Sequence, residues 1–128
     1  MKEPNIKALK IEPGKEPCVC TLINELSELQ KAVSIGADYV GLIEIINLEN
    51  DVCLLCNEEG KIINLEPNRR LGKDIICGVF YLIGQDEDGE LTSLSERATE
   101  FYTEYFADAE VIDSDEVEET IMINFEII

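Results

Sequence analysis

Short apolar runs follow one another along this chain, and several are joined by connections of only a few residues. The clearest case is Val52–Leu71, reading VCLLCNEEGKIINLEPNRRL, in which two apolar runs flank a polar turn at Gly60. This pattern predicts a β-hairpin whose second strand stops at Pro67, followed by a loop or a single helical turn. Connections this short cannot hold a crossover helix, so the strands are expected to pair mainly in antiparallel fashion.

Other apolar runs predict further strands, because they alternate or are rich in β-branched residues. These strands are expected at residues 6–11, 18–23, 39–48 and 120–128. Asp74–Ile83, reading DIICGVFYLI, is apolar enough to be a central strand buried on both faces.

Helical spacing of apolar residues predicts two helices. The first is expected at residues 25–35, after Asn24 as N-cap and before Gly36 in a left-handed conformation. The second is expected at residues 91–107, with Leu94, Ala98 and Tyr102 in its apolar stripe. The predicted fold class is therefore α+β, a mostly antiparallel or mixed sheet of about six or seven strands with two helices on one face.

The chain has 128 residues, which predicts a single domain that includes its acidic C-terminal third. The formal net charge is −18, and it is unevenly distributed. Residues 86–128 carry 15 acidic residues against one basic residue, a net of −14, whereas residues 1–85 carry 13 against 9. Such a field repels phosphate backbones and attracts basic surfaces. We therefore expect a basic protein surface as partner and no direct binding of nucleic acid.

The sequence also bounds the compartment. No apolar run approaches the roughly 20 residues of a membrane span, and the N-terminus has no apolar block of signal-peptide length. We expect a cytoplasmic protein without a membrane partner. Its five cysteines are then expected to be reduced thiols, since their number is odd and no export signal is present.

Four of these cysteines raise the question of a metal site. Cys18-x-Cys20 and Cys53-x-x-Cys56 together could supply four thiolates to zinc. Residues three apart in a strand point to opposite faces, however, so Cys53 and Cys56 would not converge. We expect the cysteines to pack as small apolar residues, and we expect no metal and no other cofactor.

The sequence contains few of the residue patterns that enzymes use for catalysis. The chain has no His, which excludes Ser–His and Cys–His nucleophilic pairs, and it has no glycine-rich phosphate loop. Acid–base catalysis by carboxylates stays open, although abundance on a solvated surface says nothing about a raised pKa.

Two sets of residues are candidates for binding. Asn68, Arg69 and Arg70 could hold an anion or a partner's carboxylate, because Arg offers a bidentate fork. Pairing of these arginines with the acidic third of the same chain is an equally good interpretation.

The second set is acidic. Glu96, Glu100 and Glu104 recur about every 6 Å along the second predicted helix, and Asp108 and Glu110 follow in an acidic linker at 108–119. A stripe of this kind is not far from the phosphate spacing of a duplex, and it would fit the basic DNA groove of a restriction or other defence enzyme. The competing interpretation is a charged surface that only keeps the protein soluble.

Several segments, in their order and spacing, resemble the DUF3846 family, a domain of unknown function. They are residues 6–14 (IKALKIEPG), 29–33 (LQKAV), 52–61 (VCLLCNEEGK), 67–69 (PNR) and 74–84 (DIICGVFYLIG). The resemblance spans about Ile6 to Gly84 and implies an accessory protein of a phage or conjugative element. Cysteines matching Cys18, Cys20 and Cys53 are not part of the family pattern, which puts a family-wide metal site in doubt.

Three functions follow as hypotheses. The first is a non-enzymatic accessory protein that binds a basic partner through residues 86–119, in counter-defence as a nucleic-acid mimic. The second is a small-molecule-binding or catalytic domain with a pocket near residues 52–71. The third is a structural subunit that pairs with a second copy through a sheet edge or through residues 120–128.

Overall fold

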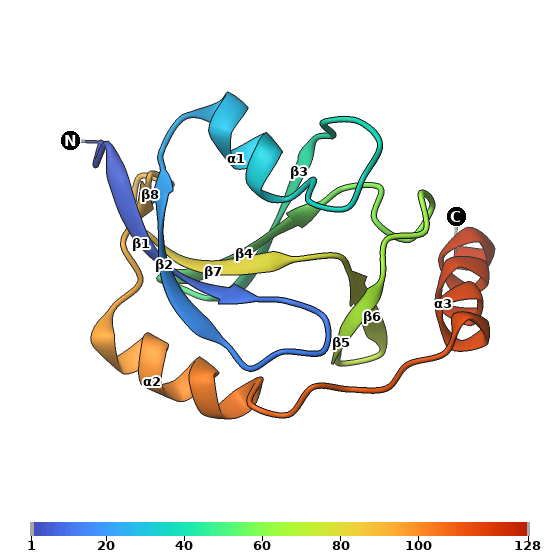
Figure 1. Ribbon diagram of the computed structural model, residues 1–128. Helices are drawn as coiled ribbons and strands as arrows, with labels where there is room; N and C mark the ends of the chain where they lie inside the picture. The colour runs from blue at the N-terminus through green and yellow to red at the C-terminus, as the bar shows by residue number, and fades with distance from the viewer. Residues whose placement is uncertain (1, 128) are drawn as a thin grey trace.

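The computed structural model describes residues 2–127, with side chains as far as residue 121. In this range it contains strands and helices in an α+β arrangement, which confirms the predicted class (Figure 1). The strands are β1 (Asn5–Ile11), β2 (Cys18–Ile23), β3 (Ile43–Glu49), β4 (Val52–Asn57), β5 (Pro67–Leu71), β6 (Asp74–Cys77), β7 (Phe80–Gln85) and β8 (Leu91–Thr92). The helices are α1 (Leu26–Ala32), α2 (Glu96–Tyr105) and α3 (Ser114–Ile127).

The main sheet has the order β2-β1-β7-β4-β3, with β8 paired to the end of β7, and β5 and β6 form a separate two-stranded sheet. Every pairing is antiparallel, as the short connections predict. β7 lies in the middle, where Leu82 stands opposite Leu9 of β1 and Leu54 of β4. Both faces of this central strand are buried, because its residues contribute alternately to two apolar clusters.

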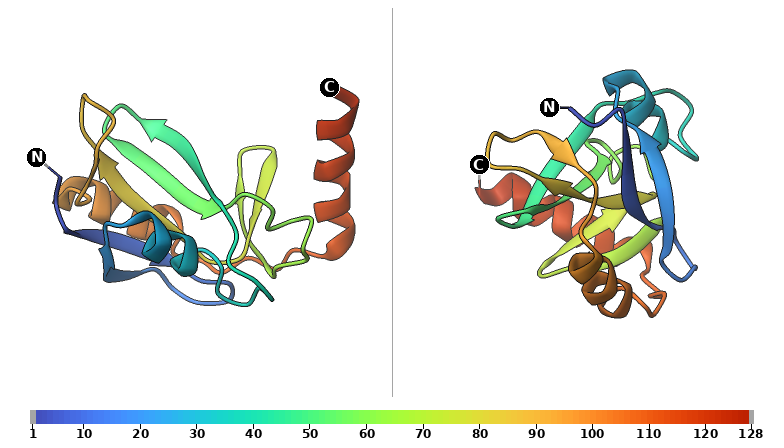
Figure 2. Two further views of the ribbon diagram at one scale, coloured as in Figure 1. Left: turned by 90° about the horizontal axis from the view of Figure 1, so that it is seen from above. Right: turned by 90° about the vertical axis from the view of Figure 1, so that its left-hand side faces the viewer.

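The two predicted helices cover opposite faces of the main sheet, so the expectation that they share one face is wrong (Figures 1 and 2). On one face, Leu54 and Leu82 lie in a cluster with Ala98 of α2. On the other face, Leu55 lies in a cluster with Leu29 of α1. Two helices are needed because β4 and β7 are apolar at consecutive positions and not only at alternate ones.

The predicted hairpin at residues 52–65 does not form. β4 pairs with β3 and β7, and residues 58–64 are turns. Asn57 begins the change of direction, since its side-chain oxygen accepts a hydrogen bond from the Glu59 N–H at 2.9 Å. Pro67 opens strand β5 where a loop was expected, because the first residue of a strand can lack a ladder donor.

The apolar run at residues 74–83 is not one strand but two, which belong to different sheets. The break is at Gly78, whose φ of +85° is a left-handed conformation. A Cβ at this position would lie 2.7 Å from Cδ1 of Leu65. Glycine at this position therefore lets the chain leave the small sheet and enter the large one.

The predicted strand at the C-terminus is wrong over residues 120–127, which belong to α3; Ile128 lies outside the described residues. Asp113 begins this helix by accepting a hydrogen bond from the Glu116 N–H at 3.0 Å. Val117 and Ile121, four residues apart, pack with Ile75 of β6, so helical spacing decides the conformation. In this structure residues 120–127 therefore offer no strand for pairing with a second copy.

The first two helices are shorter than predicted. Asn24 is not the N-cap of α1: its side chain donates to the backbone carbonyls of Glu3 and Leu91, and Glu25 takes the capping position. α2 begins only after Ser95, whose hydroxyl accepts a hydrogen bond from the Ala98 N–H at 3.1 Å. Within residues 2–127, no helix combines the length and the apolar character that a membrane crossing needs.

Replacing Gly78 by Ala is expected to lower the free energy of unfolding by about 2–3 kcal/mol, because a left-handed residue would gain a clash with Leu65. The matched control is Gly72→Ala. Gly72 has a φ of +60° but open space where its Cβ would lie, so about 1 kcal/mol is expected. Urea unfolding of both variants measures the difference, and equal losses would show that the contact with Leu65 carries no weight.

Candidate functional site

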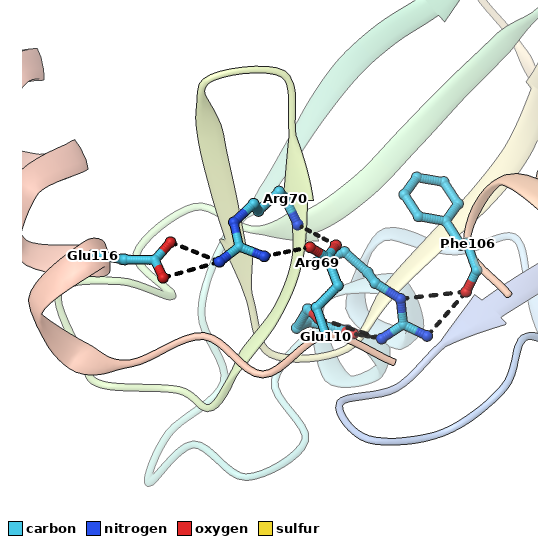
Figure 3. Close-up of polar contacts among 6 residues, drawn as sticks. Arg69, Arg70, Phe106, Glu110 and Glu116 are labelled. Atoms are coloured by element: carbon cyan, nitrogen blue, oxygen red, sulfur yellow. Dashed lines mark hydrogen bonds and ion pairs between the residues drawn. The ribbon is translucent and has the colours of Figure 1, made fainter. Parts of the chain in front are cut away.

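Strand β5 carries both arginines of the predicted site, and it points them in opposite directions (Figure 3). Arg69 is 1% exposed, whereas Arg70 lies on the surface. A register shift between Pro67 and Arg69 also turns Asn68 inward, so that two consecutive polar residues are buried.

The guanidinium of Arg69 is hydrogen-bonded to two distant parts of the chain and to the neighbouring Asn68. Its Nε and Nη2 donate to the backbone carbonyl of Phe106 at 3.3 and 3.0 Å, and Nη2 also donates to the carbonyl of Lys15 at 2.7 Å. Nη1 donates to the side-chain oxygen of Asn68 at 2.8 Å. Phe106 is the C-cap of α2, so this cation lies where the helix dipole is negative.

Burial lowers the pKa of Arg69, and the nearby carboxylates of Glu110 and Asp108 act in the opposite direction. Asn68 completes the arrangement by donating to the carbonyls of Ile11 and Gly78, both at 2.9 Å. Asn68 and Arg69 therefore join β1, β5, α2 and the connection between β6 and β7. In this structure their polar atoms are occupied by the chain itself and are not open to a ligand.

Arg70 pairs with the acidic segment of the same chain (Figure 3). Its Nη1 lies 2.6 Å from Oε1 of Glu110, and its Nη2 lies 2.8 Å from Oε2 of Glu116. Glu110 also accepts the backbone N–H of Arg70 at 2.8 Å. These bonds raise the pKa of Arg70, with the hydrogen bond to Glu116 as the largest cause. The intramolecular pairing that the sequence left open is thus present for Arg70.

The other acidic candidates lie apart from the arginines. Glu96, Glu100 and Glu104 are exposed on α2, opposite its buried residues Ala98 and Tyr102. Among the described residues, none of the three has a basic nitrogen within 4.0 Å. The structure therefore divides the predicted residues into an arginine–carboxylate group around β5 and a row of free carboxylates on α2.

Asp108 lies in the linker between these two groups. It is exposed, and it is close enough to Arg69 for its charge to affect that pKa. The linker passes the end of β5 on its way to α3, which is how Glu110 and Glu116 reach Arg70 (Figure 1).

The cysteines take the positions that strand geometry predicts. Cys53 belongs to the cluster under α1 and Cys56 to the cluster under α2, so their side chains lie on opposite faces of the sheet. Burial raises the pKa of Cys53 to about 11, and burial together with Glu44 raises that of Cys56 to about 12. Both thiols are therefore protonated at neutral pH and are poor nucleophiles. In the described part of the chain, no three potential ligands converge as a metal site.

One cavity lies beside residues 52–71, the region in which the second hypothesis expects a pocket. It has a volume of about 290 Å³ and lies between the ends of β3 and β4, the 58–62 turns, β6 and α3. Four carboxylates and one ammonium line it: Glu44, Glu58, Glu59, Asp74 and Lys61. Lys61 forms an ion pair with Asp74, and the Cys56 thiol donates to Oε1 of Glu44 at 3.7 Å. These residues come from separate elements, so no spacing in the sequence could indicate that they meet.

The comparison with protein families decides where the chain belongs. The model of DUF3846, a domain of unknown function, matches residues 6–107. The chain is a member of this family. The DUF3846 match extends from β1 through α2 and the Phe106 carbonyl, whereas α3 lies beyond it. No curated protein and no solved structure matches the chain.

Replacing Arg69 by Met is expected to lower the free energy of unfolding by roughly 3 kcal/mol, because the buried carbonyl of Phe106 and the partly buried carbonyl of Lys15 would both lose a charged donor. Arg70→Met is the matched control on the same strand. Its ion pairs are exposed, so a much smaller loss is expected. Urea unfolding compares the two, and a larger loss for Arg70 would contradict the structural role of Arg69.

Proposed function

We propose that this DUF3846 protein is a non-enzymatic accessory protein of a phage or conjugative element that binds a basic protein surface through residues 86–119. The row of Glu96, Glu100 and Glu104 on α2 is the observation that carries the proposal. The role in a phage or conjugative element is proposed by analogy, from the family resemblance.

The charge around α2 supports this proposal. Arg97 is the sole basic residue among residues 86–128, and it does not neutralise the row, because it turns toward Glu49 and Asp51 at 3.2 and 3.9 Å. The negative potential of these carboxylates is not reduced by a neighbouring basic group, so it can attract the basic surface of another protein. A basic surface of a partner would therefore not have to displace a basic residue of this protein to pair with the row.

The layout of the acidic segment also supports it. α2, the linker and α3 follow one another along the length of the molecule in Figure 1 and in the left view of Figure 2. The acidic segment therefore extends along the molecule and is not gathered at one point. An extended negative border suits a partner whose basic surface is a groove, such as the DNA groove of a defence enzyme.

Replacing Glu96, Glu100 and Glu104 together by Gln is expected to weaken capture of a basic partner about tenfold. The measurement is a pull-down from bacterial lysate. The captured protein should be basic, should be displaced by duplex DNA, and should elute as salt rises from about 0.1 M to about 1 M, which shortens the Debye length from about 10 Å to about 3 Å.

The control removes the same charge elsewhere, as Glu16→Gln, Glu25→Gln and Asp38→Asn, all of which are exposed and lie outside the acidic segment. This variant should retain the partner. Binding that ignores salt, or that both variants weaken equally, contradicts a role for the α2 row.

The cavity beside β4 favours a second function, the binding of a small molecule. Its lining carries four carboxylates against one ammonium, so the charge suits a small aliphatic amine or guanidine. The volume of about 290 Å³ is at the lower end for small-molecule sites, which fits a ligand of this size.

Titration with aliphatic diamines and alkylguanidines is expected to raise the melting temperature if this second function is correct, because a ligand that binds only the folded state stabilises it. Glu44→Gln removes one lining carboxylate and should reduce the shift. Glu25→Gln, on an exposed residue outside the cavity lining, should leave it unchanged. The absence of any shift across the series counts against an amine site.

A further inference from the structure

Two aromatic side chains of α2 lie on the surface, although a buried apolar cluster lies beneath the same helix. Phe101 is 52% exposed and Tyr105 is 58% exposed, and neither belongs to the buried cluster beneath the helix. Their rings are stacked with centroids 6.1 Å apart and an interplanar angle of 21°. A large exposed aromatic pair in the most acidic third of the chain is a feature that solubility does not explain.

The inner rings of α2 hold the outer pair in place. Phe101 packs edge-on against Tyr102 at 4.9 Å, and Tyr105 packs edge-on against Phe106 at 4.8 Å. Tyr102 and Phe106 are buried, and the Tyr102 hydroxyl donates to Oε2 of Glu49 at 2.6 Å. The exposed rings therefore have a fixed orientation, which lowers the entropy that a partner must remove on binding.

The aromatic pair runs parallel to the row of carboxylates. Phe101 lies three residues before Glu104 and four before Tyr105, and residues at these spacings are neighbours on a helix surface. The aromatic pair therefore lies next to the row of carboxylates. The helix thus presents a row of negative charge and a row of aromatic faces side by side. These are the two features that a guanidinium group satisfies at once.

We propose that this face of α2 is a docking surface for an arginine-bearing segment of a basic protein. The edge of a guanidinium forms bidentate hydrogen bonds with Glu100 or Glu104, and its flat face stacks on Phe101 or Tyr105. An ammonium satisfies the carboxylate but has no planar face to stack. The inference rests on the proposed function and sharpens it, since it selects arginine over lysine.

Charge complementarity also excludes a second copy of this chain as the occupant. Each copy carries a net charge of −18, and this face holds Glu96, Glu100 and Glu104. Two such faces would place like charges opposite each other, which opposes association.

The test uses two synthetic peptides of equal length and charge, one with arginines and one with lysines at the same positions, titrated into the full chain by calorimetry at low salt. The arginine peptide is expected to bind about two- to fivefold more tightly. Phe101→Ala with Tyr105→Ala should abolish this preference and leave the lysine peptide nearly unchanged. Glu96→Gln, Glu100→Gln and Glu104→Gln together should weaken both peptides.

Two control variants test whether the preference for arginine depends on the aromatic rings of α2. Phe101→Leu with Tyr105→Leu keeps apolar bulk but removes the rings, and it should also lose the preference. Tyr39→Ala removes another exposed aromatic, 51% exposed and outside α2, and should retain it. Equal affinities of the two peptides, or a preference that survives the loss of both rings, overturn the inference while the proposed function stands. If neither peptide binds in a salt-dependent way, the proposed function fails as well.

Discussion

The guanidinium of Arg69 is bonded to the carbonyl with which α2 ends, and much of the arrangement depends on this contact. It joins the second sheet to the helix that covers the main one, and through Lys15 it also holds the turn after β1. A buried cation needs such partners, because its desolvation is otherwise uncompensated. It finds them in backbone carbonyls and the Asn68 side chain, and carboxylates influence it only from a distance.

This contact also separates the two parts of the acidic segment. After the end of α2, which Arg69 contacts, the chain passes β5 before α3 begins (Figure 1). Glu110 and Glu116 there meet Arg70, whereas the carboxylates of α2 stay free of basic partners among the described residues. Neighbouring arginines of one strand thus have different roles, one inside the fold and one on its surface.

The sequence predicted the class and the two helices that follow apolar periodicity. It predicted the central strand only in part, because residues 80–83 lie in β7 whereas residues 74–77 belong to the other sheet. The predictions were wrong where tertiary contacts decide the structure. Gly78 reads as one residue of an apolar run, and only its approach to Leu65 explains why the strand breaks there. Residues 120–127 are apolar enough for a strand, but Asp113 and the contacts of Val117 make them a helix. The exposed carboxylates of α2 were predictable from helical spacing alone. The burial of Arg69 and the carboxylate lining of the cavity were not, because they depend on which strands become neighbours.

The way in which α3 is attached has a consequence for the order in which the protein opens. The described side chains of α3 are held by the small apolar cluster of Leu65, Ile75, Cys77 and Val117 and by one exposed ion pair, between Glu116 and Arg70. The main sheet, by contrast, is buried on both faces around β7. Elements with few buried contacts open at a lower free-energy cost than the global transition. From the contacts of its described residues, α3 is expected to be released before the main sheet opens, and its departure would open one wall of the cavity while the segment that matches the family stays folded.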